Sequence, residues 1–258
     1  MSEETAPVKR SKKGKGWTIH LFPVPILIIY GMFVLYPILA ALSYSFFSFK
    51  GFTRDSFVGL DNFVTLFTTE PYGSMFRNAF SHNVLYFCVQ MVVMNGLAFL
   101  LAFIVYKKVK GAEFFKVAFF LPRLLSVIVV GFLWKLILNP NFGTLNLILG
   151  KLGLENLQRA WLGEPETALI SIILVNCWFG LGFGVLIFLA GFQSIPGELI
   201  EAARLDGAKG VSMLRKIYIP LMIPSILIMT VLTFIQSFEA FELVYAMQGS
   251  MGEPYYST

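Results

Sequence analysis

Long apolar runs limit the folds open to this sequence. A helix that rises ~1.5 Å per residue needs about 20 apolar residues to cross a hydrocarbon core ~30 Å thick. Five runs are long enough, at 21–47, 83–106, 117–138, 168–192 and 221–247. Because only 14% of the residues are charged, against about 25% in soluble proteins, we predict an all-α, multi-pass membrane protein. Its transmembrane domain is expected to cover 21–258 and to contain five transmembrane helices.

Polar residues interrupt these runs. The second run contains Gln90 and Asn95, and the fourth contains Asn176. Since such side chains avoid lipid, we expect the helices to pack around a polar interior. Arg123 and Lys135 lie toward opposite ends of the third run, so we expect both to extend to the membrane interfaces.

Basic residues collect in alternate segments between the runs. Residues 1–20, 107–116 and 193–220 are basic, whereas acidic residues match or outnumber basic ones in 48–82 and 139–167. Cytoplasmic connections retain positive charge, so we expect the basic N-terminal segment and both basic connections in the cytoplasm. This topology explains the net charge of +5, and nucleic acid is not an expected partner. The first run is too long for the core of a cleaved signal peptide.

Motifs for catalysis and nucleotide binding are missing from the sequence. It contains neither G-x-x-x-x-G-K-[ST] nor G-x-S-x-G. His20 and His82 lie far apart without spaced partners, and Cys88 and Cys177 lie inside apolar runs. We therefore expect no catalytic residue, no metal site and no cofactor held by this chain.

The stretch "EAARLDGAKGVSMLRKIYIP", residues 201–220, is polar and rich in small residues. Pro196 suits the first turn of a helix, which Gly207 would end. A second short helix over about 209–218 would then end at Pro220, where the last run begins. One interpretation of this helix–turn–helix is an amphipathic elbow that only reverses the chain at the membrane surface.

The spacing in this stretch favours a second interpretation. It resembles the E-A-A-x3-G-x9-I-x-L-P signature of the membrane-spanning subunits of ATP-binding-cassette importers, with Ile219 in place of Leu. The resemblance implies the type I importer permease fold and a coupling helix that seats in a groove of a separate ATPase. The residues implied in ATPase coupling are Glu201, Ala202, Ala203, Asp206, Gly207, Ile217 and Pro220.

Further motifs resemble the carbohydrate-uptake branch of this family. They are "FVGLDNF" at 57–63, "FGTLN" at 142–146, "LDGA" at 205–208 and "QGSMGEP" at 248–254. The resemblance implies a second homologous permease, two ATPase subunits that hold ATP and Mg²⁺, and an extracytoplasmic solute-binding protein. It also implies a carbohydrate substrate, a bacterial or archaeal cytoplasmic (inner) membrane, and a sixth helix that would follow residue 258.

Two helix faces are candidates for the solute pathway. One carries Asn176, Phe179, Gly180 and Phe183, and the other carries Thr233, Gln236, Ser237 and Ala240. Both lie at a similar depth when ~1.5 Å per residue is counted from the expected membrane edges. Their amides, hydroxyls and rings suit a sugar, and the resemblance implies that maltose-type relatives use aligned positions. Equally, Asn176 and Thr233 could bridge helices, and Gly180-x3-Gly184 could be a packing surface.

Glu239 and Glu242 fall late in the fifth run, which places both near the outer membrane interface. We interpret them as belonging to the outer mouth or to a contact with the binding protein. The alternative is an ion-coupled secondary transporter that uses these carboxylates, which predicts inverted halves that the sequence does not show.

Overall fold

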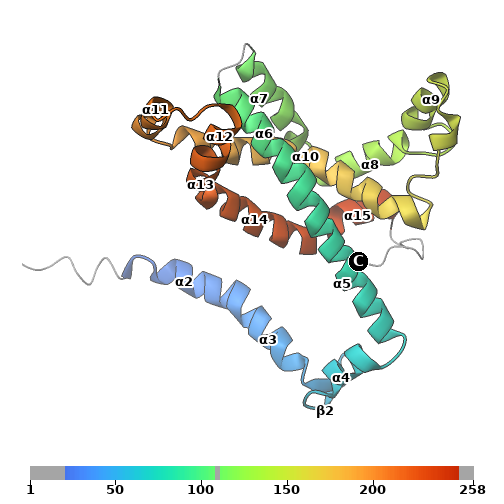
Figure 1. Cartoon of the computed structure of the whole chain (residues 1–258). Coiled ribbons are helices and arrows are strands. Elements are labelled where there is room, and N and C mark those ends of the chain that lie inside the picture. The colour runs from blue at the N-terminus through green and yellow to red at the C-terminus, as the bar shows by residue number, and fades with distance from the viewer. Residues whose placement is uncertain (1–20, 108–110, 250–258) are drawn as a thin grey trace, which may run out of the picture. The chain divides into compact units, whose positions relative to one another are not determined.

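The computed structural model describes residues 21–107 and 111–249. The chain forms two compact units, residues 1–74 and residues 75–258. Helices make up most of both units (Figure 1). Within the described residues, three helices are long and apolar enough to cross a membrane, or up to five if each of two bent helix pairs is one span.

The first unit contains one apolar helix and a small hairpin. Helix α2 (Val24–Tyr30), a π-helical turn (Gly31–Leu35) and α3 (Tyr36–Tyr44) form a continuous span of 21 residues. Pro37 is the second residue after the π turn, and wider hydrogen bonding of this kind lets a helix absorb a proline.

The first helix ends earlier than the apolar run. It stops at Tyr44 rather than at residue 47, because the chain turns there into an antiparallel hairpin. The hairpin strands are β1 (Phe47–Lys50) and β2 (Thr53–Phe57), followed by α4 (Asp61–Thr68). Asn62, from the 57–63 motif, donates hydrogen bonds to the carbonyl oxygens of Ser45 (2.8 Å) and Phe47 (3.0 Å). This side chain therefore fixes the hairpin to the end of the helix.

The second span is longer than predicted. Helix α5 (Tyr72–Val89), a π-helical turn η2 (Gln90–Met94) and α6 (Asn95–Tyr106) form one helix of 35 residues. At ~1.5 Å per residue it is ~52 Å long, which exceeds a hydrocarbon core of ~30 Å. Its polar first turns therefore extend beyond the apolar run.

The third run is bent rather than straight. Helix α7 (Ala112–Phe120) continues into a 3₁₀ turn (Leu121–Leu124), and α8 (Val127–Ile137) leaves it at 97°. Leu125 and Ser126 have extended backbone at the break. Ser126 stands directly before α8, a position where serine is common.

Helix α10 (Pro165–Gln193) is the core of the second unit and packs against α6, α7, α14 and α15. Its glycines permit close approach, because a Cβ on Gly184 would lie 2.9 Å from the Cβ of Ala98. Figure 1 shows α9 (Thr144–Lys151) and α11 (Gly197–Leu205) at opposite ends of α10.

The last run is also divided. Helix α12 (Gly210–Met213), a π turn (Leu214–Tyr218) and α13 (Ile219–Leu221) form one helix, and α14 (Ile223–Phe238) follows at a bend of 67°. Pro220 does not end the helix as predicted, because the preceding π turn absorbs it. The bend comes at Met222, just before Pro224 in the first turn of α14. A second break separates α14 from α15 (Phe241–Gln248).

Candidate functional site

A cavity of about 560 Å³ lies between α5, α10, α14 and α15. Four of the eight residues predicted for the pathway line it: Asn176, Phe179, Gln236 and Ala240. The remaining lining residues are Tyr86, Arg123, Val127, Glu239, Phe241, Glu242 and Leu243. Amides, a phenol and aromatic rings therefore meet at one place, with charged groups beside them.

The other four predicted pathway residues do not line this cavity. Thr233 is 1% exposed, and its hydroxyl accepts a hydrogen bond of 3.0 Å from Nδ2 of Asn95. The Ser237 hydroxyl donates to the backbone oxygen of Phe234 (2.7 Å). A Cβ on Gly180 would lie 2.7 Å from the sulfur of Met94. Phe183, the fourth, is half-buried, and none of the four lines the cavity, so their pathway role stays a prediction.

Arg123 lines the cavity, at the break in the third run. Its guanidinium lies 4.7 Å from the ring centroid of Phe179 and 6.0 Å from that of Phe183. A cation over an aromatic face is stabilised by the ring quadrupole. On an unbroken helix this side chain would lie toward one end of the run, which is why the sequence predicts it at a membrane interface. The Ser126 signal for a new helix could have revealed the turn.

Glu239 and Glu242 also line the cavity and are exposed. Placing them on one continuous helix was wrong, because α14 ends at Phe238 and α15 begins at Phe241. Glu242 lies in the first turn of α15, where the helix dipole stabilises a carboxylate.

Helix α11 and the turn after it form a surface that we call the knuckle (residues 197–210). Within the knuckle, Ile200 and Ala203 are buried on the inner side, whereas Leu205 at the tip is 90% exposed. Also exposed are Glu201, Ala202, Asp206 and Gly207. Of the three residues in the E-A-A motif, Ala203 therefore packs inward and the other two face outward.

Gly207 has a backbone requirement that explains its place in the motif. Its φ is +83°, and a Cβ there would meet nothing within 4 Å. The amide of Gly207 donates to the carbonyl of Arg204 (3.1 Å), and the amide of Ala208 donates to that of Ala203 (2.9 Å). These two bonds form a Schellman motif, which ends the helix and needs a left-handed residue at this position.

An aromatic cluster connects the segment after the knuckle to the membrane helices. Tyr218 is buried and packs edge-on against Phe103 of α6 and Phe192 of α10. Its hydroxyl accepts a hydrogen bond of 3.0 Å from the Lys107 ammonium. Ile217 beside it is half-buried, and Pro220 is exposed. Sequence reasoning missed Tyr218, which lies within the 201–220 stretch and is its largest buried residue.

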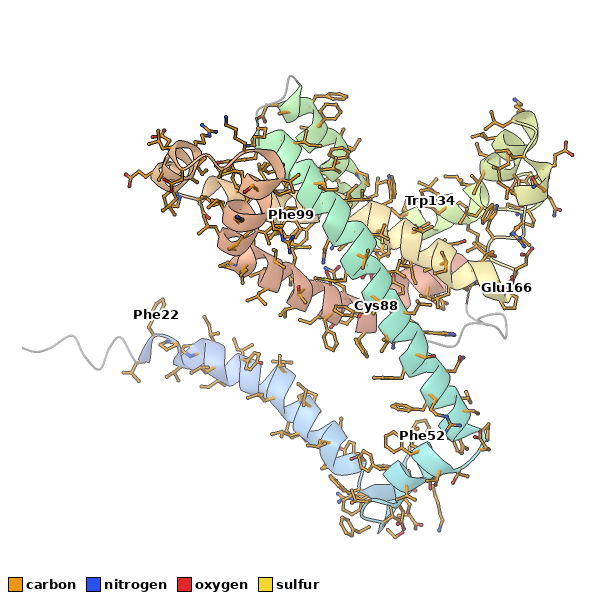
Figure 2. All side chains as sticks on the ribbon, in the orientation of Figure 1. Phe22, Phe52, Cys88, Phe99, Trp134 and Glu166 are labelled. Carbon is orange, nitrogen blue, oxygen red and sulfur yellow. The ribbon has the colours of Figure 1, made fainter. Side chains whose placement is uncertain are left out.

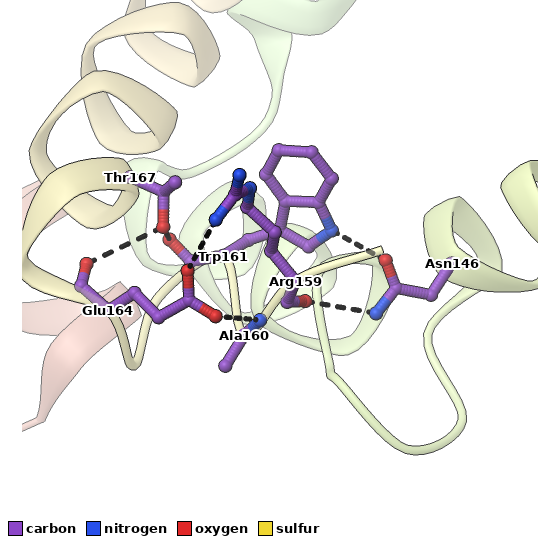
Figure 3. A network of polar contacts seen from close by, with 6 residues as sticks. All are labelled: Asn146, Arg159, Ala160, Trp161, Glu164 and Thr167. Atoms are coloured by element: carbon purple, nitrogen blue, oxygen red, sulfur yellow. Dashed lines mark hydrogen bonds and ion pairs between the residues drawn. The ribbon is translucent and has the colours of Figure 1, made fainter. Parts of the chain in front are cut away.

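The end of the unit near α9 is held by a polar network (Figure 3). The Asn146 amide donates to the carbonyl oxygens of Arg159 (3.0 Å) and Pro140 (3.2 Å), and its oxygen accepts from the Trp161 indole (2.8 Å). Glu164 adds hydrogen bonds to the Ala160 amide (3.0 Å) and Arg159 (3.5 Å). The 142–146 motif thus places a buried asparagine that organises this loop, which we call the α9 platform (residues 140–167).

Residues 73–257 match the family described as "Binding-protein-dependent transport system inner membrane component". The "Probable ABC transporter permease protein YurN" of Bacillus subtilis is 36% identical over 89% of this chain and 78% of its own length. The "Probable starch degradation products transport system permease protein AmyD" of Thermoanaerobacterium thermosulfurigenes is 30% identical over 86% and 73%.

Among solved structures, a chain in the crystal structure of a bacterial alginate ABC transporter, in complex with its alginate pentasaccharide-bound periplasmic protein, superposes with a TM-score of 0.75. It is 25% identical, and the match covers 92% of this chain and 78% of that one.

Proposed function

This chain belongs to the family of binding-protein-dependent transport system inner membrane components, and from that premise we propose how its parts work. It is a multi-pass membrane subunit of a transporter rather than an enzyme. We propose that it is one permease of an ATP-driven importer that carries a sugar or oligosaccharide by alternating access. The observation that carries this proposal is the knuckle, whose signature residues surround an apolar tip, Leu205, that the described residues leave 90% exposed.

The knuckle would be the contact with an ATPase. Glu201, Ala202, Asp206 and Gly207 present polar and small groups around Leu205, which suits insertion into a groove of a partner. Because the sequence has no phosphate-binding loop, ATP and Mg²⁺ would be held by two separate ATPase subunits. A second, homologous permease would complete the membrane part.

Movement of the knuckle would reach the cavity through the aromatic cluster. Tyr218 contacts both α6 and α10, and α10 carries Asn176 and Phe179 into the cavity. Packed aromatic side chains at van der Waals distance are stiff, so a displacement at one end moves the helices together. Movement of the segment that follows the knuckle would thereby reach the helix that carries Asn176 and Phe179.

The cavity chemistry suits a carbohydrate. Amide and phenol groups exchange hydrogen bonds with sugar hydroxyls, and aromatic rings stack on C–H faces. The relatives' names, which specify starch degradation products and alginate, support the same class of solute. Both carboxylates at the cavity mouth would help to receive the solute from its binding protein.

The topology follows from the basic segments. Residues 1–20, the 107–116 connection and the knuckle would face the cytoplasm of a bacterium or archaeon. The α9 platform would then face outward, where the solute-binding protein docks. Its buried Asn146 network supports this role, because a docking surface needs a fixed shape.

Uptake into right-side-out membrane vesicles tests the proposal against its ion-coupled alternative. The known relatives do not support that alternative. The assembled transporter should take up radiolabelled malto-oligosaccharides or alginate oligosaccharides with ATP, and a protonophore should not abolish that uptake. Uptake that persists without ATP and stops with the proton gradient would overturn the proposal.

A further inference from the structure

One face of the second span carries buried polar groups that lack partners. Within residues 21–107 and 111–249, buried side-chain nitrogen or oxygen atoms without a hydrogen-bond partner occur on His82, Tyr86 and Gln90. These residues are four apart, so they lie above one another on a single helix face. Both polar atoms of the Gln90 amide lack a partner, and its side chain is 0% exposed.

The π turn adds a fourth polar residue to this face. Gln90 and Asn95 lie at either end of the turn Gln90–Met94. Because hydrogen bonds in a π turn run from i to i+5, residues five apart come nearly into line, as residues four apart do in an α-helix. In an unbroken α-helix Asn95 would instead lie on the opposite side. We call His82, Tyr86, Gln90 and Asn95 the polar stripe. In Figure 2 the labels Cys88 and Phe99 mark the helix on either side of the turn.

The polar stripe leads from the cavity toward the α11 end of the unit. Tyr86 lines the cavity together with Asn176 and Gln236. At ~1.5 Å per residue, Gln90 lies about 6 Å beyond Tyr86 and Asn95 about 13 Å beyond it. At Asn95 the stripe meets α14, through the hydrogen bond to Thr233. The cavity lining therefore continues as a line of polar side chains between packed helices.

Helix packing alone does not explain Gln90, whereas the Tyr86 phenol lies close to the side chain of Asn176. Buried polar groups in native proteins nearly always have partners, and a leucine would fill the site of Gln90 without leaving any group unsatisfied. Asn95 shows the contrast, because it already bridges α6 and α14. Unpaired groups of this kind next to a cavity indicate that their partner arrives from outside the protein.

We propose that the part of the polar stripe from Tyr86 to Asn95 is the inward half of the solute route. Tyr86 and Gln90 exchange hydrogen bonds with the hydroxyl groups of the saccharide as it leaves the cavity, and the Asn95–Thr233 bond closes the route behind Gln90 until the helices separate. This inference rests on the proposed function for the identity of the solute. It adds residues of the second span to a route that the sequence placed on the fourth and fifth runs alone.

Thiol accessibility during ATP turnover tests the route without knowledge of the solute. Gln90→Cys is introduced into the full assembly in a background where Cys88 and Cys177 are changed to alanine. The route predicts that a charged, water-soluble methanethiosulfonate labels this thiol at least tenfold faster with ATP than without it. The matched control is Val92→Cys, from the same turn but on the outward side, where the side chain is 74% exposed; ATP should not accelerate its labelling.

Uptake by Gln90→Leu supplies the second arm. The variant should assemble with a melting temperature equal to or above that of the parent, yet take up malto-oligosaccharides or alginate oligosaccharides at least tenfold more slowly. Labelling of Gln90→Cys that ATP does not change, with normal uptake by Gln90→Leu, would overturn the inference. If the parent assembly takes up neither saccharide while ATP still exposes position 90, the carbohydrate assignment fails and the route stands.

Discussion

The hydrogen bond between Asn95 and Thr233 allows a test of whether Thr233 bridges two helices or contacts the solute. Thr233 is 1% exposed and Asn95 is 4% exposed, and the bond joins two helices within the second unit. Thr233→Val keeps the shape but removes the acceptor, and the Met91 sulfur, a weak acceptor, lies 3.1 Å from the same amide. Because a buried group left unsatisfied costs about 1–3 kcal/mol, we expect Thr233→Val to lower the free energy of unfolding by that amount.

The double variant is the sharper measurement. Asn95→Leu with Thr233→Val removes both polar groups, so its free energy of unfolding should return to within about 1 kcal/mol of the parent. The assay is SDS-titrated unfolding of the purified chain in mixed micelles, with all four proteins of the cycle measured together. If the two single changes add without coupling, or if Thr233→Val unfolds at the parent's midpoint, the helix-bridge reasoning is refuted.

Three further changes test other parts of the structure. A Cβ on Gly182 would overlap α7 backbone, so Gly182→Ala should destabilise the chain by about 1–3 kcal/mol. The control, Gly96→Ala, should not destabilise it, because a Cβ there meets nothing within 4 Å; equal melting temperatures for the two variants would contradict this packing. Gly207→Asp should leave the chain inserted but abolish transport-coupled ATP hydrolysis, and coupled hydrolysis in this variant would count against the ATPase contact. The control, Gly51→Asp, also changes a left-handed glycine in open space and should keep coupled hydrolysis. Asn146→Leu removes the side-chain hydrogen bonds that hold the α9 platform. Stimulation of ATPase activity by the binding protein should then fall at least tenfold at unchanged basal activity, and full stimulation would argue that the platform faces another partner.

The sequence predicted the positions of the spans better than their shapes. Run length and hydropathy located the apolar helices because these depend on composition within one segment. The 97° break before α8 and the continuation through Pro220 depend instead on local backbone choices that hydropathy averages away. The helix of the knuckle was predictable because Gly207 and Pro196 are local signals of its ends.

The candidate site was only half visible in the sequence. Helical spacing predicted Asn176 and Gln236 as pathway residues, and both line the cavity. It could not show that Arg123 joins them, since this requires the break in the third run. Nor could it reveal the π turn that brings Asn95 into line with Gln90, because an extra residue in one helical turn leaves no mark on hydropathy.

The central claim is that the knuckle receives its movement from an ATPase. A photo-cross-linking amino acid at position 205, the exposed tip, tests this most directly in the membrane of a cell that makes the whole transporter. We predict a covalent adduct with the ATP-hydrolysing subunit whose yield changes with nucleotide. Adducts with lipid alone, in every nucleotide state, would contradict the account.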